Sequence, residues 1–326
     1  MQQAIRWGIL GTGGIARQLA IAVNDTEGAV LQAVASRSGP QAARFAAEHG
    51  SRSHYPSYAE LVADPQVEVV YIATPHAQHY AAVMLCLEAG KAVLCEKPFT
   101  LNAREARQAI TYAKARGLFL MEAMWTRFIP AIREAEAMVA RGEIGRVHAV
   151  QADFGFHHPF EPAHRLYDPA LGGGALLDIG IYPLALGQLF LGPVASTNAQ
   201  AELGQSGVDE QTAFSLQHAG GGMTGGFCSL RAQTPWEATL MGERGSIRLH
   251  SPFFKPERLT LTRDGVSTTS EYPHRGNGYG YEVEEVNRCL RAGLCESPRM
   301  PWADTLISMD ALDTIRAQIG LRYPGE

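Results

Sequence analysis

Short apolar runs alternate with amphipathic segments over the first third of the chain. The apolar runs have the length of strands, and the segments between them repeat their apolar positions with the period of a helix. The predicted strands are residues 5–10, 30–35, 67–73, 91–95 and 118–122. The predicted helices are residues 14–24, 41–49, 76–89 and 102–116. This alternation predicts a parallel sheet with helices on both faces.

The pattern changes near Met124. After one more predicted helix at residues 128–141, the chain is richer in glycine and in turn signals such as Arg263-Asp264-Gly265. Strands joined by such turns form antiparallel sheets. Later helices are expected at residues 281–292 and 304–319. The predicted fold class is α/β, with a parallel sheet in residues 1–123 and an α+β domain on a largely antiparallel sheet in residues 124–326.

The composition and net charge of the chain argue against some classes of protein. The 326 residues are 46% hydrophobic and 19% charged with a net charge of −5, which allows a large core and lacks the basic character of nucleic-acid-binding proteins. The five cysteines include no CxxC pair, which favours a reducing compartment. We read no leader peptide after Met1 and no apolar run long enough for a bilayer. We therefore expect a cytoplasmic protein that binds neither nucleic acid nor membrane.

A glycine pattern follows the first predicted strand. Gly11-Thr12-Gly13-Gly14-Ile15-Ala16 reads GxGxxA and opens the next helix. The first glycine permits a tight turn, the second lets the backbone approach a pyrophosphate, and the small third position lets the helix pack on the strand. The helix N-terminus offers N–H groups to phosphates. We expect Gly11 to Ile15 to bind a dinucleotide in a Rossmann-type domain, the alternative being an ordinary glycine turn.

The end of the second predicted strand indicates which dinucleotide. NAD-binding proteins commonly place Asp or Glu there for the ribose 2′-hydroxyl. This chain has Ala35-Ser36-Arg37-Ser38 instead. Arg37 can pair with a 2′-phosphate, and the Ser36 hydroxyl can donate to it. The sequence therefore predicts NADP(H), unless Arg37 is only a solvated loop charge.

Polar residues follow two of the predicted parallel strands. Thr74-Pro75-His76-Ala77-Gln78-His79 follows the third strand, and Glu96-Lys97-Pro98 follows the fourth. Ligands of open α/β sheets bind at the carboxyl ends of the strands. The residues expected to contact the cofactor are Thr74, Pro75, His76, His79, Glu96 and Lys97. Lys97 is also expected to hold a substrate oxygen, the alternative being a surface lysine.

Three motifs in this order resemble those of the glucose-fructose oxidoreductase / inositol dehydrogenase family. They are Gly11–Ala16, Glu96-Lys97-Pro98 and Gly172–Tyr182, which reads GGGALLDIGIY. The chain is most similar to the dimeric dihydrodiol dehydrogenase / D-xylose dehydrogenase branch, on Met121–Phe128 and the His76/His79 pair. Many members end the third motif in histidine, and Tyr182 in its place argues against an inositol dehydrogenase. The resemblance covers nearly the whole chain and implies an NADP(H)-dependent oxidoreductase of a small sugar, polyol or cyclic trans-diol.

The resemblance also implies a mechanism. The family's lysine corresponds to Lys97, and Tyr182 stands where the family has its proton donor or acceptor. Tyr182 would take a hydroxyl proton as hydride leaves carbon, with cationic Lys97 lowering its pKa from about 10. Asp178 lies four residues before Tyr182, so in a helix both share a face, and Asp178 is expected to orient Lys97 or bind a substrate hydroxyl. The alternatives are a packing role for Tyr182 and a cap or ion pair for Asp178.

Further candidates line a substrate wall, because aromatic faces suit the C–H surface of a sugar or ring diol. They are Trp125, Arg127, Phe154, Phe156, Arg165 and Tyr279. The aromatic residues can instead fill a core, and Arg165 can instead form a structural ion pair. The spacing of His76 and His79 permits a shared metal with His157 or His158, but no carboxylate or cysteine completes a set, so no metal is expected.

Two further expectations concern assembly and activity. Members of the family commonly pair through the C-terminal sheet, which implies a homodimer or homotetramer. A non-catalytic NADP(H)-binding sensor or regulator of the same fold is the alternative to an enzyme, although such proteins usually have a damaged lysine or third motif. The direction of the reaction is open, because cellular cofactor ratios decide it.

Overall fold

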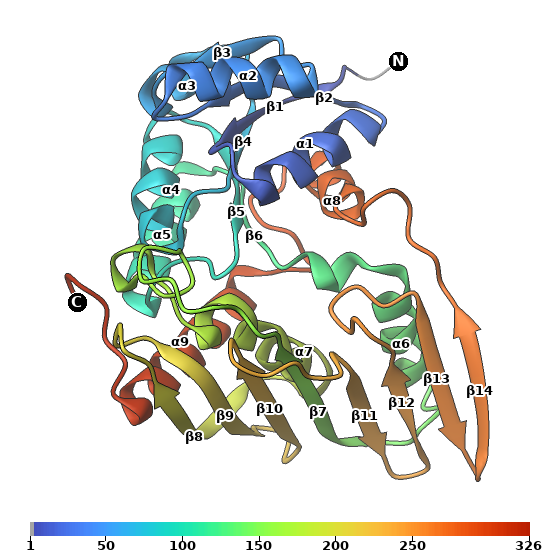
Figure 1. Cartoon of the computed structure of the whole chain (residues 1–326). Coiled ribbons are helices and arrows are strands. Elements are labelled where there is room, and N and C mark those ends of the chain that lie inside the picture. The colour runs from blue at the N-terminus through green and yellow to red at the C-terminus, as the bar shows by residue number, and fades with distance from the viewer. Residues whose placement is uncertain (1–2) are drawn as a thin grey trace. The chain divides into compact units, whose positions relative to one another are not determined.

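The computed structural model describes residues 3–326 and divides the chain into two compact units. Unit 1 comprises Met1–Trp125 and Arg275–Thr305, and unit 2 comprises Thr126–His274 and Leu306–Glu326. The sequence analysis places residues 275–305 with the second domain, whereas in the structure they lie in unit 1. Each unit is built on its own sheet, as Figure 1 shows.

Unit 1 contains a six-stranded sheet in the order β3-β2-β1-β4-β5-β6, and every pairing in it is parallel. Its strands are β1 (Ile5–Leu10), β2 (Ala29–Ala35), β3 (Ser53–Tyr55), β4 (Val69–Ile72), β5 (Ala92–Glu96) and β6 (Leu120–Ala123). Its helices are α1 (Gly14–Asp25), α2 (Gly39–His49), α3 (Tyr58–Ala63), α4 (His79–Glu88), α5 (Ala103–Arg116) and α8 (Gly280–Arg291). The predicted parallel sheet with crossover helices is confirmed, and the order reverses between β1 and β4.

Local signals account for the helix ends in unit 1. Helix α5 begins after Asn102, whose side chain accepts a hydrogen bond from the Glu105 N–H, and it ends at Gly117 with φ of 62°. Helix α3 has the same start, with the Ser57 side chain accepting from the Glu60 N–H. The sequence analysis missed α3 and β3, because both are too short to show a periodic pattern.

The returning segment of unit 1 is held to the first strands by hydrogen bonds. Asn287 of α8 accepts a hydrogen bond from the Trp7 indole at 3.1 Å, and both residues are buried. The Leu120 N–H of β6 donates to the Cys295 carbonyl at 2.9 Å. Helix α8 also packs beside α1, as Figure 1 shows. Residues far apart in sequence therefore share the core of unit 1.

Unit 2 contains an eight-stranded sheet in the order β14-β13-β12-β11-β7-β10-β9-β8. Its strands are β7 (Val147–Gly155), β8 (Val194–Leu203), β9 (Asp209–His218), β10 (Met223–Ser229), β11 (Ala238–Gly242), β12 (Gly245–Leu249), β13 (Arg258–Arg263) and β14 (Val266–Glu271). Strands β7 and β10 pair in parallel and all other neighbours are antiparallel, which confirms the predicted sheet type.

Helix α7 (Ile181–Leu191) lies against this sheet, together with α6 (Pro130–Ala140), and Gln318 of α9 (Trp302–Ile319) donates a hydrogen bond to the Thr197 carbonyl of β8. A Cβ at Gly187 would overlap the Thr224 hydroxyl of β10, so the glycine permits the close approach of α7 to the sheet. The segment Pro169–Leu191 is long and apolar enough to cross a membrane by length and composition, contrary to the sequence analysis. However, the most apolar 18-residue window of this segment is 83% buried inside the protein, as is usual for a core helix.

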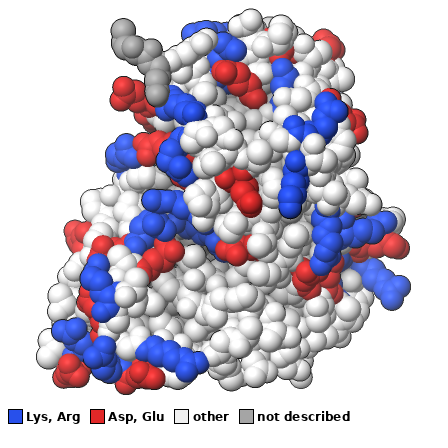
Figure 2. All heavy atoms as spheres, turned by 180° about the vertical axis from the view of Figure 1, so that it is seen from behind, with Lys and Arg blue, Asp and Glu red and all other residues white. Residues whose placement is uncertain are grey.

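The charged side chains are mixed over the face drawn in Figure 2. Lys and Arg alternate there with Asp and Glu, and broad uncharged areas separate the groups. All five cysteines are free thiols, and four of them are buried.

Candidate functional site

The glycine loop of unit 1 forms an open cradle at the start of α1. Gly11 has φ of 105°, and a Cβ there would lie 2.7 Å from the Ala73 carbonyl oxygen, so no other residue fits without strain. Nothing lies within 4 Å of a Cβ built at Gly13 or Gly14. Helix α1 has no side-chain cap at Gly13, so its first N–H groups face this open space. The loop therefore fits the pyrophosphate of a dinucleotide.

Ser36 and Arg37, which follow β2, are the residues predicted to bind the 2′-phosphate of NADP(H). Ser36 is buried and its hydroxyl oxygen accepts a hydrogen bond from the Ser38 N–H at 3.3 Å, whereas Arg37 is exposed. Burial raises the pKa of nearby Tyr58, and the positive charge of Arg37 opposes this rise. The position that would bind a ribose 2′-hydroxyl through a carboxylate thus presents a cation.

His79 joins the loops that follow β4 and β5. Its ring is buried. The Nδ1 atom lies 2.8 Å from the Pro98 carbonyl oxygen, and the Nε2 atom lies 2.9 Å from the Thr74 carbonyl oxygen. Burial lowers the pKa of His79, and the two carbonyls oppose that shift because a neutral ring can donate to only one of them. The His76 ring lies 5.7 Å from that of His79. The structure thus brings together the Thr74–His79 and Glu96–Pro98 segments.

Glu96 lies in a buried cluster of acidic groups. Its Oε1 accepts a hydrogen bond from the Tyr71 hydroxyl, and its Oε2 accepts one from the Lys97 N–H at 3.2 Å. Glu282 of α8 is fully buried, and neither of its carboxyl oxygens has a hydrogen-bond partner within residues 3–326. Burial first, and the Glu96 carboxylate second, raise the pKa of Glu282 well above its usual range. Glu282 therefore retains its proton beside Glu96 near neutral pH.

Glu122 fixes the other side of the Lys97 loop. This buried carboxylate accepts hydrogen bonds from the Phe99 N–H at 3.1 Å and from the Thr305 hydroxyl at 2.9 Å. The loop after β5 is therefore held from β6 as well as from His79 at the start of α4. Such anchoring keeps a side chain at the end of a strand in one place.

Two predicted substrate-wall residues meet in unit 1. The rings of Trp125 and Tyr279 are stacked, with centroids 4.0 Å apart and planes 9° apart. Trp125 lies two residues after the end of β6, and Tyr279 directly precedes α8. The carboxyl edge of the sheet therefore gains an aromatic surface that the returning segment completes. Arg127, another predicted wall residue, is buried in the short turn Trp125–Phe128.

The third motif forms an irregular turn in unit 2. Residues Leu176–Gly180 are π-helical and lead into α7, whose second residue is Tyr182. The expectation that Asp178 and Tyr182 share a face assumed a regular α-helix, and the π turn changes that spacing. Asp178 is buried and forms a paired interaction with Arg165, at 3.0 and 3.3 Å. In unit 2 the structure therefore joins Asp178 and Arg165 in an ion pair.

Tyr182 belongs to a cluster of aromatic rings in unit 2. Its ring centroid lies 5.7 Å from that of Phe154 and 5.3 Å from that of Phe254. The centroid of the Phe154 ring also lies 6.2 Å from that of Phe156 and 5.2 Å from that of Trp236. Phe154 stacks on Phe254, with the two centroids 4.5 Å apart. Tyr182 is 7% exposed. The predicted residues Phe154, Phe156 and Tyr182 are therefore close together.

Sequence reasoning missed several members of these groups. Trp236 and Phe254 come from irregular segments, and Trp236 has a positive φ of 61° that no local pattern announces. Glu122 lies inside the stretch Met121–Phe128, but nothing in that stretch marks its role. In the sequence, Glu282 can be recognised only as one acidic residue of an amphipathic helix.

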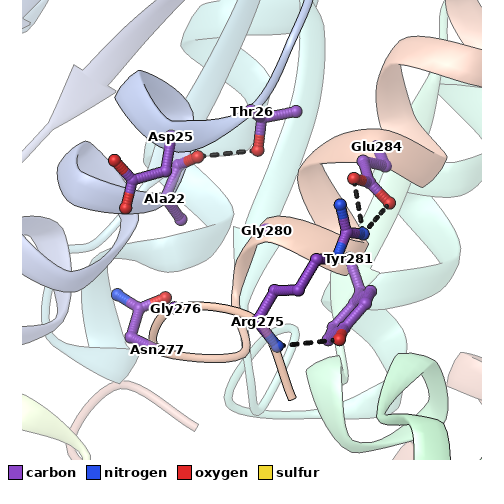
Figure 3. A pocket seen from close by; sticks show the side chains of 9 residues that line it. All are labelled: Ala22, Asp25, Thr26, Arg275, Gly276, Asn277, Gly280, Tyr281 and Glu284. Carbon is purple, nitrogen blue, oxygen red and sulfur yellow. Dashed lines mark hydrogen bonds and ion pairs between the residues drawn. The ribbon is translucent and has the colours of Figure 1, made fainter.

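A separate pocket in unit 1 contains none of the predicted site residues (Figure 3). It lies between the end of α1 and the start of α8, and Arg275 spans it by binding Glu284 at 2.7 and 2.9 Å. The Arg275 guanidinium also lies 4.9 Å from the centre of the Tyr281 ring. Its cation is therefore paired with Glu284, and the Asp25 carboxylate also lines the pocket. Within the described residues 3–326, no group of three or more His, Cys, Asp or Glu side chains is arranged to hold a metal.

Comparison with known proteins gives consistent matches over both units. Residues 5–124 match the oxidoreductase family with an NAD-binding Rossmann fold, and residues 132–248 match the GFO/IDH/MocA C-terminal domain. The chain is 38% identical to the trans-1,2-dihydrobenzene-1,2-diol dehydrogenases of Bos taurus and Homo sapiens, over 98% of each chain.

Solved structures agree with the fold. The 3-ketoreductase KijD10 of Actinomadura kijaniata, in complex with NADP and TDP-benzene, is 26% identical with a TM-score of 0.89, over 97% of this chain and 98% of that one. An aldose-aldose oxidoreductase of Caulobacter crescentus has a TM-score of 0.87 at 24% identity, over 97% of each chain, which shows the shared fold. The chain therefore belongs to the GFO/IDH/MocA family of oxidoreductases and is an enzyme of the dehydrogenase or reductase type.

Proposed function

We propose that this enzyme is an NADP(H)-dependent, cytoplasmic oxidoreductase acting on a secondary or anomeric C–OH of a small sugar, polyol or cyclic trans-diol. The observation that carries the proposal is the arrangement at the carboxyl edge of the sheet in unit 1. An open glycine cradle after β1, a cation after β2 and the anchored Lys97 loop after β5 all lie at this edge of one sheet. In open α/β sheets a dinucleotide binds across this edge.

The residues of the chain supply binding, orientation and proton transfer. The first N–H groups of α1 bind the pyrophosphate, and Arg37 with Ser36 binds the 2′-phosphate. The bound nicotinamide supplies the hydride chemistry. Lys97 donates a hydrogen bond to the substrate oxygen, and the Tyr182 phenol accepts the hydroxyl proton during oxidation or donates it during reduction. Asp178, paired with Arg165, holds a substrate hydroxyl or orients the neighbouring groups.

The substrate class rests on the relatives and on the aromatic surfaces. Relatives with 38% identity are named as dehydrogenases of a cyclic trans-diol. The Trp125–Tyr279 stack and the cluster around Phe154 present ring faces, which suit the C–H surface of a sugar or a ring diol. Both observations favour a compact polyhydroxylated substrate over an extended chain.

The experiment is a substrate panel followed by absorbance at 340 nm. Aldoses, polyols and cyclic trans-diols are each tested with NADP⁺ and NAD⁺, and the matching ketones and lactones are tested with NADPH. We expect turnover with NADP⁺ on at least one sugar or diol. Tight NADPH binding without turnover on any substrate would instead favour the non-catalytic sensor of the same fold.

Replacing Arg37 with alanine should weaken NADPH binding by roughly 10- to 100-fold, because one charge-assisted interaction with the 2′-phosphate is lost. The affinity for NADH should change less than threefold, since that cofactor has no phosphate there. Isothermal titration of both cofactors measures this difference. Arg116→Ala, at an exposed arginine near the end of α5, is the matched control and should leave both affinities unchanged. Equal loss for both cofactors would show that Arg37 does not select NADP(H).

The outer face of the sheet in unit 2 supports the proposal of a homodimer or homotetramer. Exposed positions alternate with buried ones along β9 and β10, and those at Ala213, Gln217, Met223 and Gly225 are uncharged. A flat, uncharged sheet face suits pairing with a second copy of the same face.

Light scattering should therefore give two or four times the chain mass of 35.3 kDa at micromolar concentration. Ala213→Arg, which places a charge on that face, should shift the mass towards that of the single chain. A 35.3 kDa particle for the wild-type protein would contradict the proposal.

A further inference from the structure

A buried carboxylate lies directly behind the third motif in unit 2. Asp209, the first residue of β9, has no exposed surface. Its Oδ2 accepts a hydrogen bond from the Leu176 N–H at 2.8 Å and another from the Thr212 hydroxyl at 2.7 Å. Leu176 is the first residue of the π-helical turn that contains Asp178. One carboxylate oxygen therefore holds the start of this turn.

The glycines of the third motif leave room for the Asp209 carboxylate. Gly174 has φ of 116°, and a Cβ there would overlap the Asp209 Oδ1 atom. The neighbouring Gly173 carbonyl accepts a hydrogen bond from the Tyr323 hydroxyl at 2.6 Å. At the other end of the turn, a Cβ at Gly180 would lie 2.8 Å from the Cys228 sulfur. The glycines of the motif thus let the turn lie against Asp209 and β10 at close range.

Asp209 is an acidic group in this region that ionises near neutral pH. Its Oδ1 has no hydrogen-bond partner within residues 3–326. Burial raises the pKa of Asp209 to about 7, although the hydrogen bonds from Thr212 and Leu176 and the charge of Arg316 act in the opposite direction. A carboxyl in this condition changes its charge near neutral pH.

The other titratable groups that face Asp209 keep their charge state. Burial raises the pKa of the Cys228 thiol and that of the Tyr323 phenol well above their usual ranges, so both stay neutral. Arg316 stays cationic and binds Asp313 and Glu326 at 2.7 Å each. Asp178 is paired with Arg165. A proton gained or lost near pH 7 in this part of unit 2 is therefore assigned to Asp209.

We propose that Asp209 is a proton-linked positioning residue for the reaction, whose carboxylate holds the π-helical turn that carries Asp178 and leads into Tyr182. The proposal rests on the roles given above to Asp178 and Tyr182. Hydrogen bonds to an ionised acceptor are stronger than those to a neutral one, so the turn is held more firmly when Asp209 has lost its proton. Asp209 touches no substrate, and it acts through the placement of the turn.

The activity test compares the pH dependence of kcat in three proteins. The wild type should show an ionisation near pH 7 that Asp209→Asn lacks, because the amide keeps an acceptor for Leu176 but cannot titrate. Thr212→Val removes a hydrogen bond that favours the charged form, so it should shift the same ionisation upward by about one pH unit. Above pH 8, kcat of Asp209→Asn should fall by roughly tenfold, with the KM for NADP⁺ unchanged. An Asp209→Asn profile identical to that of the wild type would overturn the proposal.

A second readout does not depend on finding a substrate. Hydrogen exchange of a peptide covering residues 172–182, corrected for intrinsic chemical exchange, should slow in the wild type as pH rises through 7. The same peptide in Asp209→Asn should show no such change, and Asp264→Asn, at an exposed turn, should behave like the wild type. If the wild type lacks turnover, the proposed function fails while this measurement still decides the role of Asp209. Equal protection in the wild type and Asp209→Asn at every pH would overturn the proposal.

Discussion

Lys97→Ala should lower kcat/KM for NADP⁺-dependent oxidation by about a thousandfold while leaving the dissociation constant of NADPH within a few-fold of the wild-type value. Lys97 follows β5 in a loop that His79 of α4 and Glu122 of β6 anchor. The loop therefore keeps its position when the side chain is shortened. What the variant lacks is the proposed donor to the substrate oxygen.

The measurement is steady-state kinetics on the best substrate of the panel, with NADPH binding followed by fluorescence. Lys114→Ala is the matched control, because this lysine is exposed on α5 and belongs to no proposed site. It should retain wild-type kcat/KM. Wild-type activity in Lys97→Ala would place Lys97 among ordinary surface residues and remove the centre of the proposed mechanism.

The parallel sheet of unit 1 is predictable from sequence because its signals are local. Each strand is a short apolar run, each crossover helix has its own periodicity, and Gly11 to Ala16 follow the first strand directly. These patterns alone place the glycine loop at the carboxyl edge of a sheet. They place Arg37 in the same way, since the end of β2 follows from the same alternation.

The membership of residues 275–305 in unit 1 has no local signal. The amphipathic pattern of α8 predicts a helix, but it does not say which sheet the helix packs beside. That choice depends on contacts such as the Trp7–Asn287 hydrogen bond, which joins the first strand to a helix near the end of the chain. The Trp125–Tyr279 stack and the burial of Glu282 depend on the same long-range return.

The third motif shows a different limit of prediction from sequence. A spacing of four residues between Asp178 and Tyr182 suggests one helical face, yet the chain forms a π turn there. Two residues outside the motif hold this turn, since Asp209 binds Leu176 and Arg165 binds Asp178. A local pattern cannot report constraints that come from another strand and another loop. Irregular turns of this kind are frequent at functional sites.

Tyr182→Phe should lower kcat by roughly 10²- to 10⁴-fold, because it removes the group that exchanges a proton with the substrate oxygen. The phenyl ring can keep its contacts with Phe154 and Phe254, so the melting temperature should stay within a few degrees of the wild-type value. The KM of the substrate should change much less than kcat, since a proton transferred in the transition state contributes little to ground-state binding.

The control for Tyr182→Phe is Tyr167→Phe in the same unit. The Tyr167 hydroxyl donates to the His158 carbonyl at 2.7 Å and has no proposed role in proton transfer, so this variant should keep kcat within a few-fold. A solvent isotope effect on kcat should be present in the wild type and in Tyr167→Phe. If Tyr182→Phe retains full activity and the same isotope effect, Tyr182 is a packing residue of the aromatic cluster and the proton must come from another group. If activity is lost while the fold and NADPH binding persist, the phenol is the acid–base group of the reaction.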